Sequence, residues 1–557
     1  MPSTITKVEG EMKEMKKIFS ALSMIAVTVL GICLSGCAGA PAKTAEGTPA
    51  EQAPAVPKFT QKELAYMPAT AQIALFRAGV VTPSDVLEAQ IAQVQKYNGV
   101  YNTELRDLEK ELNTFNAGKI NAICFDRFAE AREAAKAATE RYRNGTARRL
   151  EGITVGVKNE NSVVGWRVDM GSLVLKDVPP CTQDCPLIER LKNEGAILVF
   201  STTVPELYVS CMTWSRLYGI TRNPWNLAFG VGGSSGGSGA ALAAGFCTIA
   251  TGSDMGGSIR IPSSMNGVYG FKPPFGRVPT SEIAYETLGP MTRTFDDLVL
   301  MQDIIAGPHP RNHATLRPKL DYPTEYQSLK GAKVAVCYFP KWLEGGCDKE
   351  VNEALDKVVE ALKKAGAEVV VIQSDWTIQG GKLATFVNGL LSTEMYELID
   401  IAADRQDLLC RNVKPFFADI KNYSPRALIK ATTMGDETHA DVQKNVFGKG
   451  CIALIMPTLA TPFVSPGFQA TENDVAWING KATRSNEIMF TPVWNLLNRY
   501  PVVDMPVMLS SKRVPIGVQI VGNTYDDLAA FRVAAGLSKV LPQMFTGDRF
   551  PDFREQK

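Results

Sequence analysis

The sequence predicts an α/β protein in which a β-sheet is sandwiched between layers of α-helices. Two observations carry this prediction. Short apolar, strand-like segments alternate with amphipathic helical segments along most of the chain. The clearest case is a βαβ unit, formed by an apolar strand at 333–338, an amphipathic helix at 349–364 and a second strand at 368–372. With 557 residues, the chain is long enough to bury a large core.

Local patterns predict the other elements in chain order. Thr82, Pro83 and Asp85 are the residue types of a helix start, and apolar residues then recur at helical spacing. Further helices are expected at 104–113, 127–143, 187–193 and 526–540, and strands at 152–158, 196–201, 267–273, 451–456, 501–509 and 514–521. Residues 386–411 and 424–440 are interpreted as helical or loop insertions.

The composition argues against several classes of function. The formal net charge is +1, from 59 basic and 58 acidic residues, so no nucleic-acid partner is expected. The three histidines (His309, His313 and His439) lie outside the Gly/Ser-rich segments, which argues against a Ser-His-Asp triad and against histidine-based metal chemistry. We therefore expect no metal and no cofactor.

Two pairs of cysteines lie close together in the sequence. Cys181 and Cys185 flank a short loop-like segment, and Cys337 and Cys347 are ten residues apart. Either pair could form a disulfide in an exported protein or remain as buried free thiols. The sequence leaves both alternatives open.

The N-terminal segment is interpreted as a targeting sequence. Residues 1–36 resemble a bacterial lipoprotein signal peptide, with a basic pair ahead of an apolar stretch, and Cys37 would be the lipid-bearing residue. Residues 37–58 would form a flexible tether. The protein would then be held by its lipid to a membrane of the bacterial cell envelope, facing the periplasm or the exterior. An ordinary signal peptide or an uncleaved anchor is the alternative.

Two Gly/Ser-rich segments, at 232–241 and 253–260, carry the most specific chemical signal. Glycines on both sides of a serine allow backbone N–H groups and the hydroxyl to face one point. Acyl transfer needs this arrangement, because the nucleophile must lie beside oxyanion donors. Serines in such loops are more commonly simple turn residues. A nucleotide-binding loop is not supported, since no Lys-Ser/Thr pair follows the first segment.

Several motifs resemble, in order and spacing, those of the amidase signature family, which includes fatty acid amide hydrolase-like enzymes and bacterial amidases. The matching motifs lie at 156–158, 232–238, 252–262, 270–273, 289–293, 456–458 and 515–522, within roughly residues 60–545. The resemblance implies the amidase signature fold, a large mixed β-sheet sandwiched between layers of α-helices. Residues 59–149 would be an N-terminal helical region packed on a catalytic core at 150–557.

The resemblance also implies a Ser-cisSer-Lys triad. Ser258 matches the nucleophile, Ser234 matches the bridging serine whose peptide bond is cis, and Lys158 matches the base. A lysine can accept the serine proton only when burial leaves it neutral. The oxyanion hole would consist of four backbone N–H groups, those of Met255, Gly256, Gly257 and Ser258.

Other residues are expected to support the site. Ser235 would hydrogen-bond within it, and Asp254 and Arg260 would form a structural ion pair. The resemblance places a loop with three candidate substrate contacts nearby, although core packing explains these residues equally well: Met212, Trp214 and Tyr218. The sequence departs from the family pattern after Lys158, where the family usually has an aspartate and this chain has Asn159 followed by Glu160. Residues 374–450 match no motif, and the family usually builds substrate specificity in this region.

The expected function is that of a membrane-tethered serine amidohydrolase, which cleaves a carboxamide to a carboxylic acid plus ammonia or an amine. Its substrate would be a small-molecule or lipid amide: a fatty acid amide, an aryl amide, a peptide C-terminal amide or a small aliphatic amide. One alternative is the glutaminase subunit of a tRNA amidotransferase, which works with partner subunits. Another is a non-catalytic binding lipoprotein that retains the fold. The sequence does not set the oligomeric state.

Overall fold

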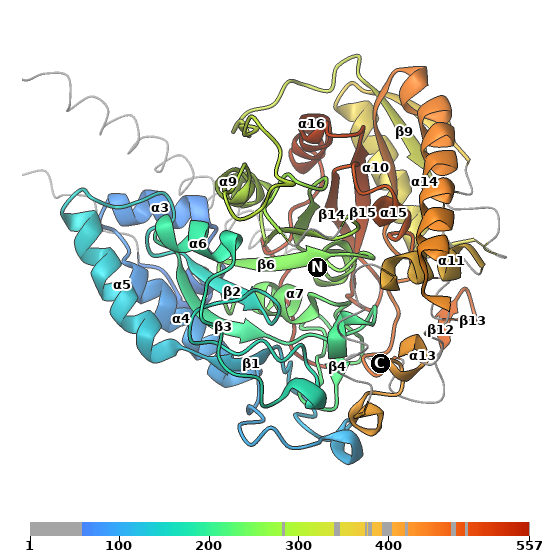
Figure 1. Cartoon of the computed structure of the whole chain (residues 1–557). Coiled ribbons are helices and arrows are strands. Elements are labelled where there is room, and N and C mark those ends of the chain that lie inside the picture. Colours follow the sequence, from blue (N-terminus) through green and yellow to red (C-terminus); the bar gives the residue numbers. More distant parts are fainter. Residues whose placement is uncertain are drawn as a thin grey trace, which may run out of the picture. The chain divides into compact units, whose positions relative to one another are not determined.

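An eleven-stranded mixed β-sheet runs through the centre of the protein (Figure 1). The computed structural model describes residues 58–280, 284–338, 343, 346–373, 376, 381–392, 404–417, 422–468, 475–484 and 488–555. The expected signal peptide (1–36), Cys37 and all of the tether except its last residue lie outside these residues. Residues Pro57–Lys557 form one compact unit. No helix among the described residues has the length and apolarity that a bilayer crossing requires.

The sheet confirms the predicted α/β class. Parallel pairs occur at β3–β2–β6 and at β11–β9–β10, and the remaining neighbours are antiparallel. The strands, in sheet order, are β1 (Ile123–Asp126), β3 (Ile197–Thr202), β2 (Thr154–Lys158), β6 (Ile249–Asp254), β8 (Thr287–Thr292), β7 (Tyr269–Lys272), β14 (Val502–Leu509), β15 (Pro515–Gly522), β11 (Cys451–Pro457), β9 (Lys333–Cys337) and β10 (Glu368–Ile372). Two short hairpins complete the strands: β4 (Trp214–Ser215) with β5 (Gly219–Ile220), and β12 (Val475–Ile478) with β13 (Lys481–Arg484).

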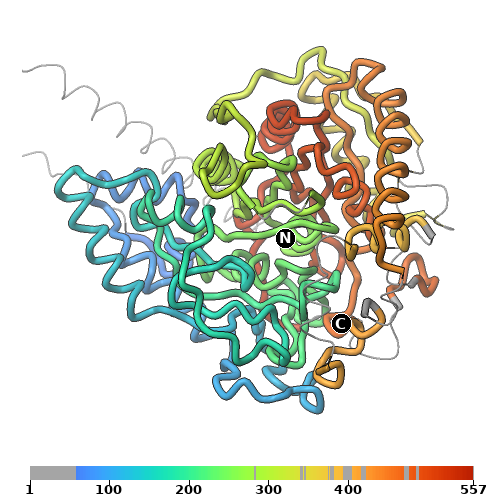
Figure 2. The backbone as a smooth tube through the Cα atoms, viewed as in Figure 1, coloured from blue at the N-terminus to red at the C-terminus, as the bar shows by residue number. Residues whose placement is uncertain are grey.

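Helices cover both faces of the sheet. They are α2 (Gln61–Tyr66), α3 (Ala69–Arg77), α4 (Pro83–Tyr97), α5 (Phe128–Arg143), α6 (Pro186–Asn193), α7 (Gly236–Ala243), α8 (Arg260–Asn266), α9 (Phe295–Ile305), α10 (Lys349–Lys364), α11 (Gly381–Leu391), α13 (Lys414–Phe417), α14 (Pro425–Asn445), α15 (Val493–Leu496) and α16 (Asp527–Ser538). Figure 2 shows the early helices (blue to cyan) gathered at one side and α14 (orange) at the other.

Successive side chains of β2 point alternately to the two faces of the sheet. Val155 and Val157 belong to the apolar cluster that also contains residues of α6 and α9. Gly156 lies between them and faces the opposite way, against Phe200 and Cys247 of the cluster that contains α7. The same alternation places Lys158 on the α7 face, so the strand directs this lysine toward the Gly/Ser-rich segment that precedes α7.

Most predicted elements are present, but residues 104–113 do not form the expected helix. They contain only a short 3₁₀ turn at Glu109–Glu111. Three leucines recur at helical spacing in this segment (Leu105, Leu108 and Leu112), but Leu105 has a φ of +51° and tertiary contacts decide the conformation. Asp107 pairs with Arg216, and the N–H of Leu108 donates to the Arg216 carbonyl at 2.7 Å. Leu108 itself is fully buried.

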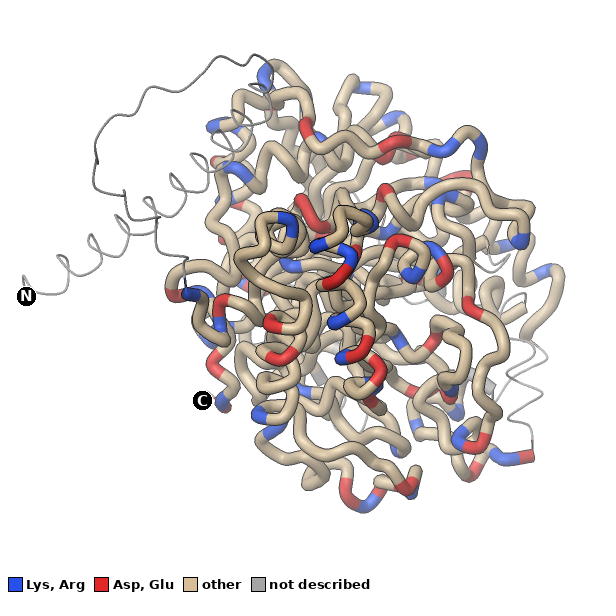
Figure 3. Tube along the Cα trace, turned by 90° about the vertical axis from the view of Figure 1, so that its left-hand side faces the viewer, with Lys and Arg blue, Asp and Glu red and all other residues tan. Residues whose placement is uncertain are grey.

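The charged residues are distributed without a dominant sign. In the view of Figure 3, Lys and Arg positions are interspersed with Asp and Glu positions over the face shown. Such a distribution lacks the basic stripe by which proteins bind polyanions.

Candidate active site

Lys158 ends β2, and its side chain is completely buried. The ammonium nitrogen Nζ donates to Ser234 Oγ at 2.8 Å and to Ser253 Oγ at 2.7 Å. It also forms an ion pair with Glu160 Oε2 at 2.6 Å. The ring of Tyr208 lies over Nζ, with its centroid 4.9 Å away. Three polar partners match the three protons of an ammonium group, so the buried cation is fully satisfied.

Ser234 lies in the first Gly/Ser-rich segment, two residues before α7. The Gly233–Ser234 peptide bond is cis, as the resemblance implied. The segment is packed so closely that side chains would not fit at two of its glycines. A Cβ at Gly236 would lie 2.1 Å from Thr213 Oγ1, and one at Gly237 would lie 2.4 Å from the Thr203 nitrogen. The glycines therefore allow the start of α7 to press against β3 and bring Ser234 to Lys158.

Ser258 lies in the turn between β6 and α8, and it is only partly buried. Its carbonyl accepts the Ser235 N–H at 3.2 Å, which ties this turn to the first Gly/Ser-rich segment. Within the described part of the chain, Ser258 Oγ makes no side-chain hydrogen bond, so no hydrogen bond joins the side chains of Ser258 and Ser234. Catalytic hydrogen bonds are often long without substrate and tighten when it binds. The space beside the neighbouring Gly256 is open, with nothing within 4 Å of an added Cβ.

The predicted oxyanion hole needs one correction. The Gly257 N–H is not available, because it donates to Asp254 Oδ1 at 2.9 Å. This bond forms because Gly257 has a φ of +123°, a conformation that a residue with a side chain rarely adopts. Among the described residues, no hydrogen bond involves the N–H groups of Met255, Gly256 or Ser258. These three remain candidates for the oxyanion hole.

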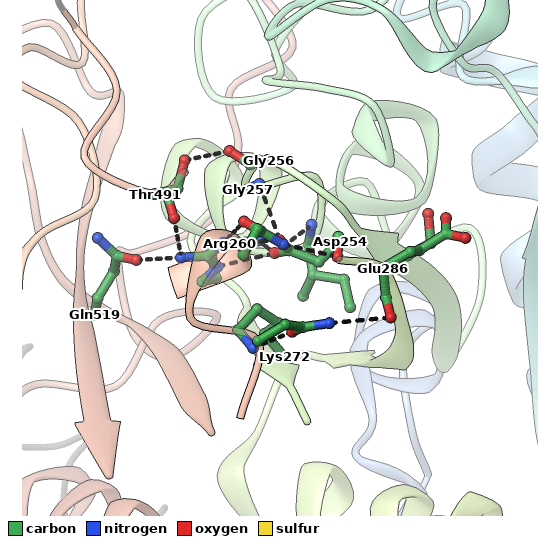
Figure 4. Close-up of polar contacts among 12 residues, drawn as sticks. Asp254, Gly256, Gly257, Arg260, Lys272, Glu286, Thr491 and Gln519 are labelled. Carbon is green, nitrogen blue, oxygen red and sulfur yellow. Dashed lines mark hydrogen bonds and ion pairs between the residues drawn. The ribbon is translucent and has the colours of Figure 1, made fainter. Parts of the chain in front are cut away.

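Asp254 and Arg260 form an ion pair across the turn that carries Ser258. Both side chains are fully buried, with Arg260 Nη2 2.7 Å from Asp254 Oδ1 and Nε 2.9 Å from Oδ2. Burial by itself would raise the pKa of Asp254, but the Arg260 guanidinium outweighs it and holds that pKa below its usual value. The remaining Arg260 donors bind three groups, shown in part in Figure 4: the Thr491 carbonyl, Gln519 Oε1 and Asn495 Oδ1.

Ser235 lies inside the site and bonds to β6. Its hydroxyl lies 3.4 Å from the Ser253 carbonyl and 3.3 Å from the Ser253 nitrogen, as donor and acceptor respectively. The structure thus brings Lys158, Ser234 and Ser235 together around β6, with Ser258 in the turn that follows this strand.

The three candidate substrate contacts are buried. Met212, Trp214 and Tyr218 are exposed by 3% or less. The Trp214 indole N–H donates to the Phe468 carbonyl at 3.0 Å, and the Tyr218 hydroxyl donates to the Asp169 carboxylate. Their packing and hydrogen bonds fit the core alternative.

Several residues of the site had no assigned role in the sequence. In the sequence, Glu160 is recognisable only as part of a departure from the family pattern. Ser253 is recognisable only as the first residue of the second Gly/Ser-rich segment. No sequence pattern predicts a role for Tyr208, because only the fold brings its ring over Lys158. Its hydroxyl donates to the Asn159 carbonyl at 3.0 Å. Burial above all, followed by two nearby glutamates, raises the pKa of Tyr208 far above its usual value, so it stays a neutral phenol.

The unmatched region 374–450 reaches the site through residues 404–417. The Cys410 N–H donates to the carboxylate of Glu206, and Asn412 Nδ2 donates to the Val209 carbonyl at 2.8 Å. Glu206 and Val209 lie on either side of the segment that contains Tyr208. Residues 404–417 are therefore in a position to influence which molecules approach Lys158.

No group of three His, Cys, Asp or Glu side chains in the described residues is arranged to hold a metal ion. None of the nine described cysteines forms a disulfide, including both pairs considered above. The polar groups at hand are hydroxyls, one ammonium, carboxylates and free backbone N–H groups. Such a set can transfer protons and bind an oxyanion.

Comparison with known proteins identifies the family. The family model described as Amidase matches residues 110–530. An acylamidase from Rhodococcus erythropolis is 28% identical over 498 residues, covering 87% of this chain and 97% of that protein. A glutamyl-tRNA(Gln) amidotransferase subunit from Desulforapulum autotrophicum is 30% identical over 451 residues, covering 74% of this chain and 89% of that protein.

A solved structure gives the same answer for the fold. The crystal structure of a bacterial aryl acylamidase of the amidase signature family matches with a TM-score of 0.74 at 24% identity, covering 85% of this chain and 96% of that one. This likeness confirms the expected amidase signature fold, with its large mixed sheet flanked by helices. Together with the family model, it shows that the chain belongs to the amidase signature family and is an amidohydrolase of carbon–nitrogen bonds.

Proposed function

We propose that the protein is a serine amidase that cleaves a carboxamide through an acyl-enzyme on Ser258, with Lys158 as the base and Ser234 as the proton relay. The single observation that carries the proposal is the 2.8 Å contact between Lys158 Nζ and Ser234 Oγ in a buried setting. A serine hydroxyl becomes an effective nucleophile only when a base takes its proton. In the proposed relay the proton moves from Ser258 to Ser234 and then from Ser234 to Lys158. This contact allows the second of these two transfers.

The reaction would proceed in two steps. Ser258 Oγ attacks the amide carbonyl carbon while its proton passes through the Ser234 hydroxyl to Lys158 Nζ. The backbone N–H groups of Met255, Gly256 and Ser258 are the available donors for the developing oxyanion. The C–N bond then breaks, and the leaving nitrogen takes the proton back through the same relay. Water hydrolyses the Ser258 ester along the same path, which releases the carboxylic acid and restores the enzyme.

The relatives and the N-terminal sequence together support a substrate class to test. The relative from Rhodococcus erythropolis is named an acylamidase, and the bacterial structural neighbour an aryl acylamidase. Acyl or aryl amides are therefore the first substrates to test. If Cys37 carries lipid, the enzyme would lie at a membrane of the cell envelope, where lipophilic amides accumulate.

The glutaminase subunit of a tRNA amidotransferase is the second candidate, favoured by the 30% identity to an amidotransferase subunit over 451 residues. These two functions differ in substrate and in partner. A glutaminase would release ammonia from glutamine and would depend on its partner subunits. An independent amidase would act alone on acyl or aryl amides.

The test is a substrate screen of the purified chain with fatty acyl, aryl and peptide amides and glutamine, combined with a serine-directed fluorophosphonate probe. We expect hydrolysis of at least one non-glutamine amide, and covalent labelling at Ser258 found by peptide mass spectrometry. The variant Ser258→Ala should lose both while keeping the wild-type unfolding transition. Full activity in that variant would rule out the nucleophile assignment. A labelled enzyme that hydrolyses only glutamine would favour the second candidate.

A further inference from the structure

The Lys158 ammonium has an anionic partner that the proposed mechanism does not use. Glu160 Oε2 lies 2.6 Å from Lys158 Nζ and accepts a hydrogen bond from Ser253 Oγ, also at 2.6 Å. Ser253 in turn accepts from Lys158 Nζ at 2.7 Å. The carboxylate thus holds the lysine directly and through one bridging hydroxyl. The Glu160 side chain is only 13% exposed, so little water competes with these contacts.

A second carboxyl group faces Glu160. Glu286 immediately precedes β8 and is 8% exposed. Its side chain hydrogen-bonds to Glu160. Its backbone carbonyl accepts from Asn498 Nδ2 at 3.2 Å, and Asn498 Oδ1 in turn accepts from Lys272 Nζ at 2.8 Å (Figure 4). Two carboxyl groups can hydrogen-bond to each other only when one of them carries a proton.

The direct contact with a cation decides which carboxyl group is ionised. Glu160 touches the Lys158 ammonium at 2.6 Å, which stabilises its charged form. Burial by itself would raise the pKa of Glu160, but Lys158 and the hydrogen bonds from Glu286 and Ser253 outweigh it and hold that pKa below its usual value. The contact with the Lys158 ammonium leaves Glu160 as the ionised group of the two. The proton between the two carboxyl groups therefore belongs to Glu286.

This arrangement has a consequence for the base. An ammonium held by a carboxylate cannot accept a proton from serine. We propose that Glu160, supported by a protonated Glu286, holds Lys158 in its charged form in the resting enzyme and thereby sets the pH at which the enzyme becomes active. Glu160 is thus a positioning residue, which acts on the reaction only through Lys158. The inference rests on the proposed function, because it takes Lys158 as the base.

The other titratable groups around Glu160 are few. They are Lys158 on β2, Glu286 before β8, Tyr208 in the turn at Glu206–Tyr208 and Cys185 before α6. Burial raises the pKa of both the Tyr208 hydroxyl and the Cys185 thiol, so each is neutral at neutral pH. Glu160 is therefore the anion that opposes the Lys158 charge among these groups.

The direction of the effect follows from the charge. In Glu160→Gln the ammonium is buried without its counter-ion, so its protonated form is less stable and the proton leaves at lower pH. The pH at half-maximal rate should fall by about one to three units, the range over which a neighbouring opposite charge moves an ionisation. Glu160→Asp keeps the negative charge, so its pH at half-maximal rate should stay closer to that of the wild type. Glu286→Gln keeps a neutral donor and should leave the midpoint within about half a unit.

The experiment measures the rate of fluorophosphonate labelling of Ser258 against pH in the wild type and the three variants, with thermal unfolding as a folding control. This readout needs no known amide substrate. A wild type that is never labelled at Ser258 overturns both the proposed function and this inference. Labelling with the same midpoint in Glu160→Gln overturns the role of Glu160 alone. If the pH midpoint of labelling falls as far in Glu286→Gln as in Glu160→Gln, Glu286 carries a charge. That result overturns the assignment of Glu286 as the protonated carboxyl group.

A second measurement does not depend on the stability of the Glu160 variants. The infrared difference spectrum of wild type minus Glu286→Gln at neutral pH should contain the C=O band of a protonated carboxylic acid. Its presence supports the proton on Glu286. A difference spectrum that contains only carboxylate bands overturns the proposed pair.

Discussion

Asp254, the last residue of β6, and Arg260, the first residue of α8, meet in a buried ion pair at 2.7 Å. The five residues between them form the turn that carries Ser258. Asp254 also accepts the N–H groups of Gly257 at 2.9 Å and Ile259 at 3.2 Å. One carboxylate therefore fixes both the arginine and the backbone of the turn that carries Ser258.

Breaking this pair on one side should destabilise the protein strongly. Asp254→Asn leaves the Arg260 charge buried without compensation, and such changes typically lower the free energy of unfolding by about 3–5 kcal/mol. Urea denaturation should show this loss, and Ser258 labelling should slow because the turn is no longer fixed. The double variant Asp254→Asn/Arg260→Met removes both charges and should lose less stability than the single variant. A single variant within about 1 kcal/mol of the wild type would contradict this account.

Two neighbouring glycines should respond in opposite ways to alanine. Nothing lies within 4 Å of a Cβ at Gly256, whereas one at Gly257 would lie 2.1 Å from Thr491 Oγ1 and would require a φ of +123°. Gly257→Ala should lower the free energy of unfolding by about 1–3 kcal/mol. Gly256→Ala should fold normally but lower kcat/KM, because its methyl group enters the open space beside Ser258. Equal stability losses in the two variants would show that this space is not open.

A second buried lysine gives a pH-dependent prediction for stability. Burial, followed by the nearby Arg260 charge, lowers the pKa of Lys272 far below its usual value, and Nζ donates to Asn498 Oδ1 at 2.8 Å. The unfolded chain therefore binds more protons than the folded chain between the lowered pKa and the unfolded value of about 10.4. The free energy of unfolding should rise with pH across that window.

Lys272→Met removes this titration. Urea denaturation from neutral pH to about pH 9 should show a smaller rise in stability with pH than in the wild type. Lys333→Met, at an exposed position on β9, is the matched control and should keep the wild-type slope. An unchanged slope in Lys272→Met would mean that Lys272 keeps its proton in the folded chain.

The sequence predicted those parts of the fold whose patterns are local. The βαβ unit at β9, α10 and β10 lies within one residue of the expected bounds, because α10 buries one regular apolar face and both strands are short apolar runs. The strand β6 was missed, since Gly252 and Ser253 interrupt its strand pattern and pairing with β2 and β8 defines it. The segment 104–113 was assigned wrongly, because contacts with Arg216 override its helical composition.

At the site, the same distinction holds. Lys158, Ser234 and Ser258 lie in recognisable motifs, so their positions could be predicted. The contacts of Glu160 with Lys158 and of Glu286 with Glu160 depend on the packing of β2, β6 and β8 in three dimensions, and a separation of more than a hundred residues hides the second contact from any local pattern. The hydrogen bond from the Gly257 N–H to Asp254 likewise depends on the geometry of the turn, which the sequence pattern does not give.

The proposed lipid anchor on Cys37 can be tested independently of the catalytic site. If Cys37 is lipidated, Cys37→Ala should move the protein from the membrane fraction to the aqueous fraction after cell disruption, because the acyl chains supply the membrane affinity. Amide hydrolysis by the released protein should be unchanged. Metabolic labelling with an alkyne fatty acid should mark the wild type and not the variant. Continued membrane association of an unlabelled variant would rule out the lipid anchor.

Replacing Lys158, the proposed base, should separate its chemical role from its structural role. Lys158→Met replaces the ammonium by an apolar side chain of similar length, so Ser258 labelling should slow by about 10²–10⁴-fold, the usual contribution of general base catalysis. The same change leaves the Glu160 carboxylate buried without its cation, which should lower the free energy of unfolding by several kcal/mol. Lys158→Met/Glu160→Gln removes both charges and should recover much of that stability while labelling stays slow. Recovery of labelling in the double variant would show that Lys158 contributes to the site only by neutralising Glu160.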